Sequence, residues 1–425
     1  MNFHEAENYV LSLGNEVTTM KLGLENIRKL LAAMGNPQDN YLKVQIAGTN
    51  GKGSTCAFLE TICLRAEIRI GLTTSPHLVS ITERVRINGL EISEDNFARL
   101  ATRVRGTSQM LVEQGALETV PTYFEQVTAI ALLAFAEAKV ELAILETGLG
   151  GRLDATTAAR SEFVGITRID YDHQAMLGNF LTEIAAEKAA VINDSRQMVV
   201  IGDQQPKAMK VTTDLCREIG VEPRLAENVD VAHSADGITL STERGSYRVK
   251  RLGLLGRHQI ENAKIALLLA ESLQSSFSIT DESIVAGLET AKHRGRLEFI
   301  GNFLFDGAHN VGGAAALRDF LDESVAEPIT MIFGTMVDKD VADVAKILFP
   351  KAATLILTQP ENSRAMSTNE LRKFVPEDLP HDKVIQTDCV AGALAAAKHV
   401  TPKGGIILVT GSLYLVGEAA KILNN

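Results

Sequence analysis

The chain has 425 residues, of which 45% are hydrophobic and 22% charged, a composition typical of a globular protein whose length allows two or three domains. The formal net charge of −11, with no run of lysine or arginine, argues against a nucleic-acid partner. No uncharged apolar stretch approaches the ~18 residues of a membrane span, and the N-terminus lacks a signal-peptide pattern. The four cysteines show neither metal nor disulfide spacing, so we expect a cytoplasmic protein.

Short apolar runs alternate with helical patterns through the first two thirds of the chain. This rhythm predicts an α/β fold with a mainly parallel sheet. Helices are expected at 55–65 and 127–138, and buried strands at 44–47, 68–73, 142–146, 163–167 and 198–201. From 222 to 250 the pattern shifts toward alternation, with turns at Asp236-Gly237 and Arg244-Gly245, which predicts a small antiparallel insert.

A polar, glycine-containing break at 292–295 follows a predicted helix at 259–274. We place a domain boundary there, with a P-loop-type domain at 1–293 and a Rossmann-like α/β domain at 294–425. The second domain is expected to contain strands at 303–305, 330–333, 354–358 and 406–409.

The segment VQIAGTNGKGST, residues 44–55, places an apolar run directly before a glycine-rich turn. A strand that ends at Gly48, followed by a helix that begins near Ser54, would direct backbone N–H groups toward one spot that suits phosphates. Lys52 could reach the outer phosphates. The strict P-loop pattern has glycine where Ile46 stands and a hydroxyl residue where Gly53 stands. The alternative to a phosphate-binding loop is a glycine-rich turn that serves only packing.

Three oxygen- or nitrogen-bearing side chains follow predicted parallel strands and should emerge at the same sheet edge. Glu146 ends one strand, Ser75 follows another, and His173 follows a third. A carboxylate beside a phosphate loop is a suitable Mg²⁺ ligand. The structural alternatives are a strand-capping glutamate, an ordinary turn serine and a hydrogen-bonded loop histidine.

Polar clusters also follow strands in the second domain. DGAHN, residues 306–310, suits contacts to ribose and phosphate, although Asp306 or Asn310 could instead cap a helix. Arg296 is a candidate phosphate partner or a plain linker arginine. Lys188 lies on a predicted helix and by default is a solvated lysine.

Together these segments resemble the folylpolyglutamate synthase and dihydrofolate synthase family of the Mur ligase superfamily. The resemblance runs through LGLENI, GNPQ, AGTNGKGS, SPHL with ERVRING, TYFEQVT, ETGLGGRLDAT, DH with LG, EKA, HQIENA, GRLE, DGAHN, FG with DKD, and GSLYLVGE. It implies a monomeric, ATP-dependent ligase that phosphorylates the carboxylate of dihydropteroate or a reduced folate, after which the amino group of L-glutamate attacks the acyl phosphate. The alternatives are a Mur-type cell-wall ligase acting on a UDP-linked substrate and a non-catalytic nucleotide-binding relative. The cell-wall ligase is disfavoured because the chain before residue 48 leaves little room for a separate UDP-binding domain.

The resemblance also implies roles for individual residues. Lys52, Glu146, His173 and Lys188 would be catalytic. One Mg²⁺ would be bound by Ser75, Glu146 and His173, and a second by Lys188 once it is carbamylated. ATP would be bound by Thr49, Asn50, Gly51, Lys52, Gly53, Ser54, Thr55, Asn262, Arg296, Asp306 and His309, and the pterin ring by Leu24, Thr122, Phe124, Asp154 and Ala155.

This sequence departs from the family pattern at several positions. They are Arg294 and Val311 in place of prolines, Ala190 in place of glycine, Thr157 in place of asparagine and Thr147 in place of an aliphatic residue. None of them removes a proposed ligand. Thr147 and Thr157 flank the substrate-side turn, so the sequence leaves open which folate is preferred, its oxidation state and the length of any polyglutamate product.

Overall fold

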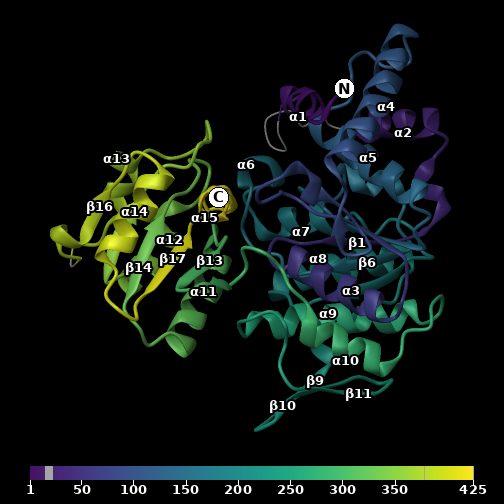
Figure 1. Cartoon of the computed structure of the whole chain (residues 1–425). Helices are drawn as coiled ribbons and strands as arrows, with labels where there is room; N and C mark the ends of the chain where they lie inside the picture. The colour runs from purple at the N-terminus through teal and green to yellow at the C-terminus, as the bar shows by residue number, and fades with distance from the viewer. Residues whose placement is uncertain (15–22, 378, 425) are drawn as a thin grey trace. The chain divides into compact units, whose positions relative to one another are not determined.

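A computed structural model describes residues 1–14, 23–377 and 379–424; Leu22, the first residue of the LGLENI motif, lies outside them. The chain forms two compact units (Figure 1). The first contains Met1–Ile169, Asn179–Gly253 and Glu261–Ala291, and the second contains Asp170–Gly178, Leu254–Ile260 and Lys292–Asn425. Two short segments from the first 293 residues thus pack with the second unit, and the division after residue 293 stays a prediction.

The first unit is built on an eight-stranded sheet with the order β4-β3-β2-β5-β1-β6-β7-β8. The strands β2, β5, β1, β6, β7 and β8 run parallel, whereas β3 pairs antiparallel with β2 and β4 pairs antiparallel with β3. All five predicted strands are present. The bounds are β1 Leu42–Ala47, β2 Ile70–Thr73, β3 Val85–Ile87, β4 Leu90–Glu91, β5 Leu142–Glu146, β6 Phe163–Ile166, β7 Met198–Ile201 and β8 Arg224–Leu225.

Helices cover both faces of this sheet, which is why strands β5 and β6 are buried at every position (Figure 1). The ring of Phe135 on α5 packs on Gly71 of β2, and Leu269 of α9 packs on Gly165 of β6. The helices are α1 Phe3–Ser12, α2 Glu25–Ala33, α3 Lys52–Arg65, α4 Glu94–Glu113, α5 Tyr123–Glu137, α7 Leu181–Ala189, α8 Pro206–Ile219, α9 His258–Leu273 and α10 Asp281–Thr290. The first turn of α9 belongs to the second unit.

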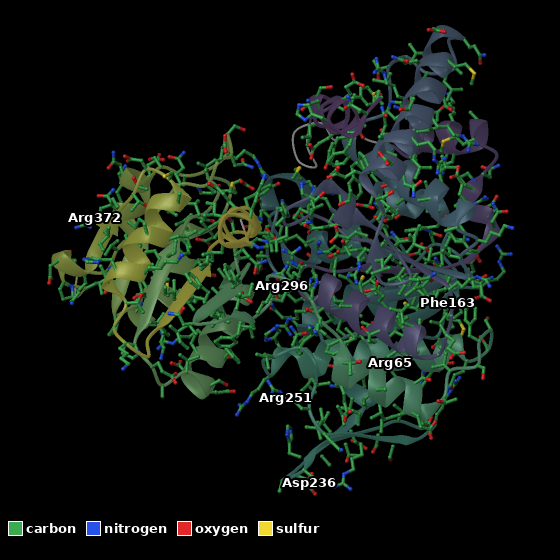
Figure 2. The ribbon with its side chains drawn as sticks, in the orientation of Figure 1. Arg65, Phe163, Asp236, Arg251, Arg296 and Arg372 are labelled. Carbon is green, nitrogen blue, oxygen red and sulfur yellow. The ribbon has the colours of Figure 1, made fainter. Side chains whose placement is uncertain are left out.

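The predicted antiparallel insert is confirmed as a three-stranded sheet of β9 Asp230–Ser234, β10 Gly237–Ser241 and β11 Ser246–Val249. Asp236 lies at the tip of its first hairpin (Figure 2). The insert is tied to α9 by Glu271, a fully buried carboxylate that accepts hydrogen bonds from Thr242 Oγ1 at 2.6 Å and Tyr247 OH at 2.9 Å.

The second unit contains a six-stranded sheet with the order β12-β13-β17-β14-β15-β16, in which only the edge strand β12 is antiparallel. All four strands predicted there are present. The strands are β12 Glu298–Ile300, β13 Phe303–Asp306, β14 Ile329–Phe333, β15 Thr354–Leu357, β16 Val384–Gln386 and β17 Ile406–Thr410. The helices are α6 Gln174–Leu177, α11 Val311–Ser324, α12 Val341–Leu348, α13 Thr368–Leu371, α14 Val390–Val400 and α15 Leu413–Asn424.

The mainly parallel α/β fold expected from the sequence is therefore confirmed in both units. Among the residues that the structure describes, none of the helices has both the length and the hydropathy needed to cross a membrane.

Candidate functional site

The glycine-rich turn connects the end of β1 at Ala47 to the start of α3 at Lys52. Gly48 and Gly51 both have positive φ, 144° and 92°. A Cβ at Gly51 would lie 2.1 Å from Asn262 Oδ1, and one at Gly48 would lie 2.0 Å from Thr167 Oγ1. At Gly48 the backbone of Thr167 also lies within 3.0 Å of such a Cβ, and a side chain at Gly51 would displace Asn262, so the glycines serve close packing as well as the backbone conformation.

Backbone hydrogen bonds hold this turn against the segment that follows β6. The N–H groups of Thr49 and Asn50 both donate to the carbonyl of Arg168, at 2.8 and 3.1 Å. The first turn of α3 therefore has a fixed position, with its N-terminus and positive dipole end at the turn. Thr55 Oγ1 lies there, fully buried and without a hydrogen-bond partner in the described part of the chain.

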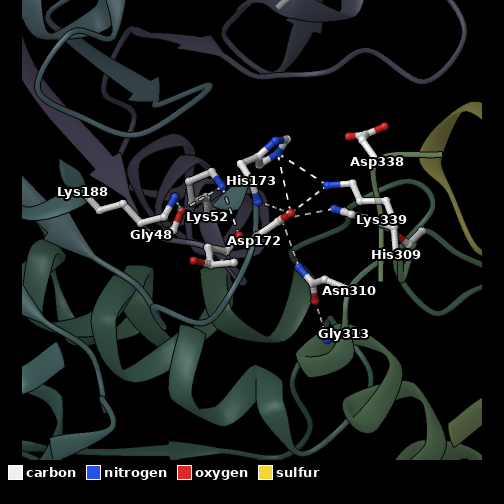
Figure 3. Close-up of polar contacts among 12 residues, drawn as sticks. Gly48, Lys52, Asp172, His173, Lys188, His309, Asn310, Gly313, Asp338 and Lys339 are labelled. Carbon is white, nitrogen blue, oxygen red and sulfur yellow. Dashed lines mark hydrogen bonds and ion pairs between the residues drawn. The ribbon is translucent and has the colours of Figure 1, made fainter. Parts of the chain in front are cut away.

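Two lysines converge on this turn. Lys52 Nζ donates to the carbonyls of Gly48 and Thr49, both at 3.1 Å, and Lys188 Nζ donates to the same Gly48 carbonyl at 2.9 Å (Figure 3). Lys188 is only 3% exposed, so the default interpretation of a solvated lysine is wrong. Two ammonium groups beside a helix N-terminus create a strongly electropositive spot, and the residues present fit the phosphates of a nucleotide.

The structure brings Ser75 and Glu146 together. Ser75 lies two residues beyond β2, and its N–H donates to Glu146 Oε2, at the end of β5, at 3.1 Å. The loop after Ser75 is held by Glu83, which accepts hydrogen bonds from three successive backbone N–H groups at 2.7 to 2.9 Å. A hydroxyl on an ordered loop and a carboxylate at the end of a strand are oxygen ligands that fit Mg²⁺.

His173, the third predicted magnesium ligand, lies in a segment of the second unit and has a left-handed φ of 50°. The structure does not unite it with Ser75 and Glu146 within one unit. Over residues 1–14, 23–377 and 379–424, no group of three histidine, cysteine or acidic side chains is arranged to hold a metal ion. The three-ligand magnesium site stays a prediction.

Asp172, next to His173, is a buried centre of polar contacts in the second unit (Figure 3). Its carboxylate accepts from Lys339 Nζ at 2.7 Å and Asn310 Nδ2 at 3.2 Å, and His309 Nε2 lies 3.8 Å away. Burial acts to raise the pKa of Asp172, but His309, Lys339 and His173 outweigh it and hold this pKa far below its ordinary value. Sequence reasoning missed Lys339, although it stands in the DKD motif.

Asp306 ends β13, Arg296 Nη1 would lie 3.5 Å from a Cβ on the following Gly307, and His309 Nδ1 lies 2.8 Å from the Gly307 carbonyl oxygen. The Asp306 carboxylate accepts from the N–H groups of Leu297 and Ala308, both at 3.0 Å. Burial raises the pKa of Asp306, and the Arg296 charge partly offsets this. Asn310 Oδ1 caps α11 by accepting from Gly313 N at 2.8 Å, so the capping alternative holds for Asn310. The ATP contacts of Arg296, Asp306 and His309 stay predictions.

All five residues predicted to bind the pterin line one pocket in the first unit, with an empty volume of about 450 Å³ that includes its open mouth. Phe124 forms part of the wall, and a Cβ on Gly148 would lie 2.6 Å from the tip of its ring. The pocket is lined by Gly23, Leu24, Thr122, Phe124, Glu125, Gly148, Leu149, Leu153, Asp154 and Ala155. A mainly apolar wall with a few polar groups suits a flat heterocycle.

Comparisons with known proteins agree with this geometry. The Mur ligase middle domain matches residues 46–270, and the Mur ligase glutamate ligase domain matches residues 295–413. The dihydrofolate synthase/folylpolyglutamate synthase of Bacillus subtilis is 32% identical, over 95% of each chain. This chain belongs to the folylpolyglutamate synthase and dihydrofolate synthase family of the Mur ligase superfamily.

Other members of the family are similar over the whole chain. A probable bifunctional folylpolyglutamate synthase/dihydropteroate synthase of Haloferax volcanii is 34% identical over 99% of this chain, which spans about half the length of that relative. Folylpolyglutamate synthase of Mycobacterium tuberculosis complexed with ADP has a TM-score of 0.91, with 28% identity over 100% of this chain and 98% of that one. E. coli FolC in complex with DHPP and ADP has a TM-score of 0.88, with 26% identity over 100% and 98%.

Proposed function

We propose that this protein is an ATP-dependent ligase that joins L-glutamate to the carboxylate of dihydropteroate or a reduced folate through an acyl phosphate. The observation that carries the proposal is the convergence of Lys52 and Lys188 on the Gly48 carbonyl, at the N-terminus of α3. Two cations at a helix N-terminus suit a triphosphate. The ADP complexes of two related structures support the same assignment.

The residues present suit this chemistry. A carboxylate is a poor electrophile and needs a phosphate leaving group, so the protein must stabilise the charge of the transferred phosphoryl group. Lys52 lies where it can do so. Magnesium, when bound by Ser75, Glu146 and His173, would supply further charge stabilisation. Lys188, if carbamylated, would become an anion that can hold a second Mg²⁺, which would also relieve its repulsion with Lys52.

The pocket beside Phe124 and Asp154 would hold the pterin ring. Asn262, whose side chain packs against Gly51, would contact the adenine. We further propose that the protein acts as a cytoplasmic monomer, since its expected substrates are all small molecules and its nucleotide is ATP.

The direct test measures ADP release in the presence of L-glutamate, ATP and Mg²⁺, with either dihydropteroate or tetrahydrofolate as the acceptor. We expect turnover with at least one acceptor and none with a UDP-linked muropeptide. Turnover with only the muropeptide would overturn the proposal in favour of a cell-wall ligase, and no turnover with any acceptor would favour a non-catalytic relative.

The phosphate-loop assignment is tested by Lys52→Ala. Removing a preorganised charge at a transferring group lowers kcat by about 10²- to 10³-fold, and we expect a loss of this size with an unchanged far-UV circular dichroism spectrum. Lys210→Ala, which truncates a lysine that is 76% exposed on α8, is the matched control and should retain full activity. Retained turnover in Lys52→Ala would contradict the assignment.

A further inference from the structure

The loop between β2 and β3, which carries Ser75, contains a buried arginine that contacts a histidine. Arg84 ends the 3₁₀ turn Ile81–Arg84, is 3% exposed, and donates from Nε to His77 Nδ1 at 2.8 Å. A guanidinium is always protonated and only donates hydrogen bonds. His77 Nδ1 is therefore the acceptor and carries no proton, and this bond sets the orientation of the imidazole.

Arg84 is itself held by the start of helix α5. Its guanidinium carbon lies 5.4 Å from the centroid of the Tyr123 ring, and Tyr123, the first residue of α5, is buried. A planar guanidinium that lies over an aromatic face keeps one orientation and gains a cation–π interaction. Arg84 thus connects His77, which is on the loop, to a helix whose position does not depend on the loop.

His77 holds the part of the loop that Glu83 does not reach. Glu83 accepts hydrogen bonds from the backbone N–H groups of residues 78–80, which fixes the second half of the loop. His77 lies between that half and Ser75, whose N–H donates to Glu146 Oε2 at 3.1 Å. The short stretch around Ser75 is therefore fixed by Glu146 on one side and by His77 on the other.

We propose that His77 is a positioning residue for magnesium: its Nδ1, held by Arg84, keeps Ser75 beside Glu146. The inference rests on the proposed function, in which Ser75 and Glu146 bind Mg²⁺. Residues that orient the ligands of a metal without touching the metal typically change its affinity by about 10- to 100-fold when they are substituted. This role requires a hydrogen-bond acceptor at the position of Nδ1 and makes no use of Nε2.

Two substitutions at His77 separate the two ring nitrogens. The oxygen of asparagine is bonded to Cγ, as Nδ1 is, so His77→Asn can still accept from Arg84, whereas the oxygen of glutamine lies one bond farther along, near the position of Nε2. The readout is the Kd of Mn²⁺, which suits the same oxygen ligands as Mg²⁺, measured by electron paramagnetic resonance on the full chain with ADP. We expect His77→Gln to raise this Kd by about 10- to 100-fold and His77→Asn to stay close to wild type.

The matched control is His233→Gln, the same substitution at an exposed histidine on β9 of the first unit, which should leave the Kd of Mn²⁺ unchanged. Both His77 variants should keep the wild-type Tm and the wild-type Kd for ADP without metal. If His77→Gln lowers the Tm and weakens ADP and Mn²⁺ binding alike, its role is structural and the inference is overturned. Equal Kd values in His77→Asn and His77→Gln, or a weaker Mn²⁺ complex in the asparagine variant alone, overturn it as well.

A variant of the partner tests the pair itself. Lysine keeps the charge of Arg84 but lacks Nε and the planar group that lies over Tyr123, so Arg84→Lys should weaken Mn²⁺ binding as His77→Gln does. Because the two residues act through one contact, the double variant should lose no more than either single variant, and additive losses would overturn the inference. If the expected Mn²⁺ pattern appears but wild type releases no ADP with any acceptor, the proposed function fails while the positioning role stands.

Discussion

The stability of the first unit should depend on pH through Glu60, a buried carboxylate on α3. Glu60 is 3% exposed, and its Oε2 pairs with Arg86 Nη2 on β3 at 3.0 Å. Its Oε1 is buried without a partner among the described residues. Burial raises the pKa of Glu60 to about 7, although the Arg86 charge acts to lower it.

The sign of the effect follows from the direction of this shift. The folded-state pKa lies above the ordinary value of 4.5, so folding favours the protonated form. The resulting stability is fully present below pH 4.5 and is lost as the pH rises through 7. The difference between the folded-state pKa and the ordinary value corresponds to at most about 3 kcal/mol in the free energy of unfolding, which is gained below pH 4.5 and lost above pH 7.

Glu60→Gln removes this titration. The glutamine oxygen can still accept from Arg86, whose guanidinium also donates to the Gly89 carbonyl at 3.1 Å, so no buried charge is left alone. We expect wild type to be the more stable of the two, or equal, at pH 5. Between pH 5 and pH 8.5 the difference between their free energies of unfolding should change by up to about 3 kcal/mol in favour of the variant.

The assay is urea unfolding of both proteins from pH 5 to 8.5, followed by far-UV circular dichroism because the chain contains no tryptophan. Glu137→Gln is the matched control, since the hydrogen bond from Arg99 lowers the pKa of Glu137 and its titration falls below this range. A stability difference between wild type and Glu60→Gln that stays constant across the range would refute the reasoning.

Two further changes follow from buried charges. Glu271→Ala removes the partner of Arg224, Thr242 and Tyr247, so it should destabilise the first unit by about 3–5 kcal/mol. Amide hydrogen exchange should become faster across β9 to β11. Unchanged protection of these strands would contradict the role of Glu271. Lys188→Ala should slow ligation, and an added short carboxylate should restore part of the rate if the lysine is carbamylated. Full activity without rescue would exclude the carbamate.

Much of the fold was predictable from local sequence patterns, whereas the residues of the proposed pterin pocket were not. Apolar runs such as Leu142–Glu146 are buried on both faces of a parallel sheet and therefore leave a strong signal in the sequence. The pocket residues were found through the resemblance, because Leu24, Phe124 and Asp154 come from distant segments that no local pattern connects. The helix starts at Lys52, before the start expected near Ser54, because of the left-handed Gly51 rather than because of periodicity.

The burial of Lys188 and the placement of His173 could not be predicted from the sequence. A lysine on a helix is solvated by default, and only the fold brings Lys188 to the Gly48 carbonyl. His173 was assigned by its position after a strand of the first unit. Its segment groups with the second unit, where Asp172 binds Lys339 and Asn310 from far along the chain, and the role of His173 as a magnesium ligand stays a prediction. Long-range ion pairs of this kind leave no periodic signal.

The two threonines that depart from the family pattern share one partner, Gln45 on β1. Its Nε2 lies 3.2 Å from Thr147 Oγ1, 2.9 Å from Thr156 Oγ1 and 2.8 Å from Thr157 Oγ1. An amide nitrogen has only two hydrogens. The hydroxyls of Thr156 and Thr157 donate their own hydrogens to Asp154 and Gly151, so both are free to accept from Gln45.

Gln45 therefore connects the strand that leads into the glycine-rich turn with the turn that forms the pocket wall. Thr156 passes this connection to Asp154, which in turn fixes the backbone of Gly148 and Leu149. An asparagine at position 157 would bring its own amide donors and compete for the same acceptors. The threonine hydroxyl instead accepts from Gln45 and donates to Gly151. The threonine at position 157 thus fits a hydrogen-bond network that links the strand before the glycine-rich turn with the wall of the proposed pterin pocket.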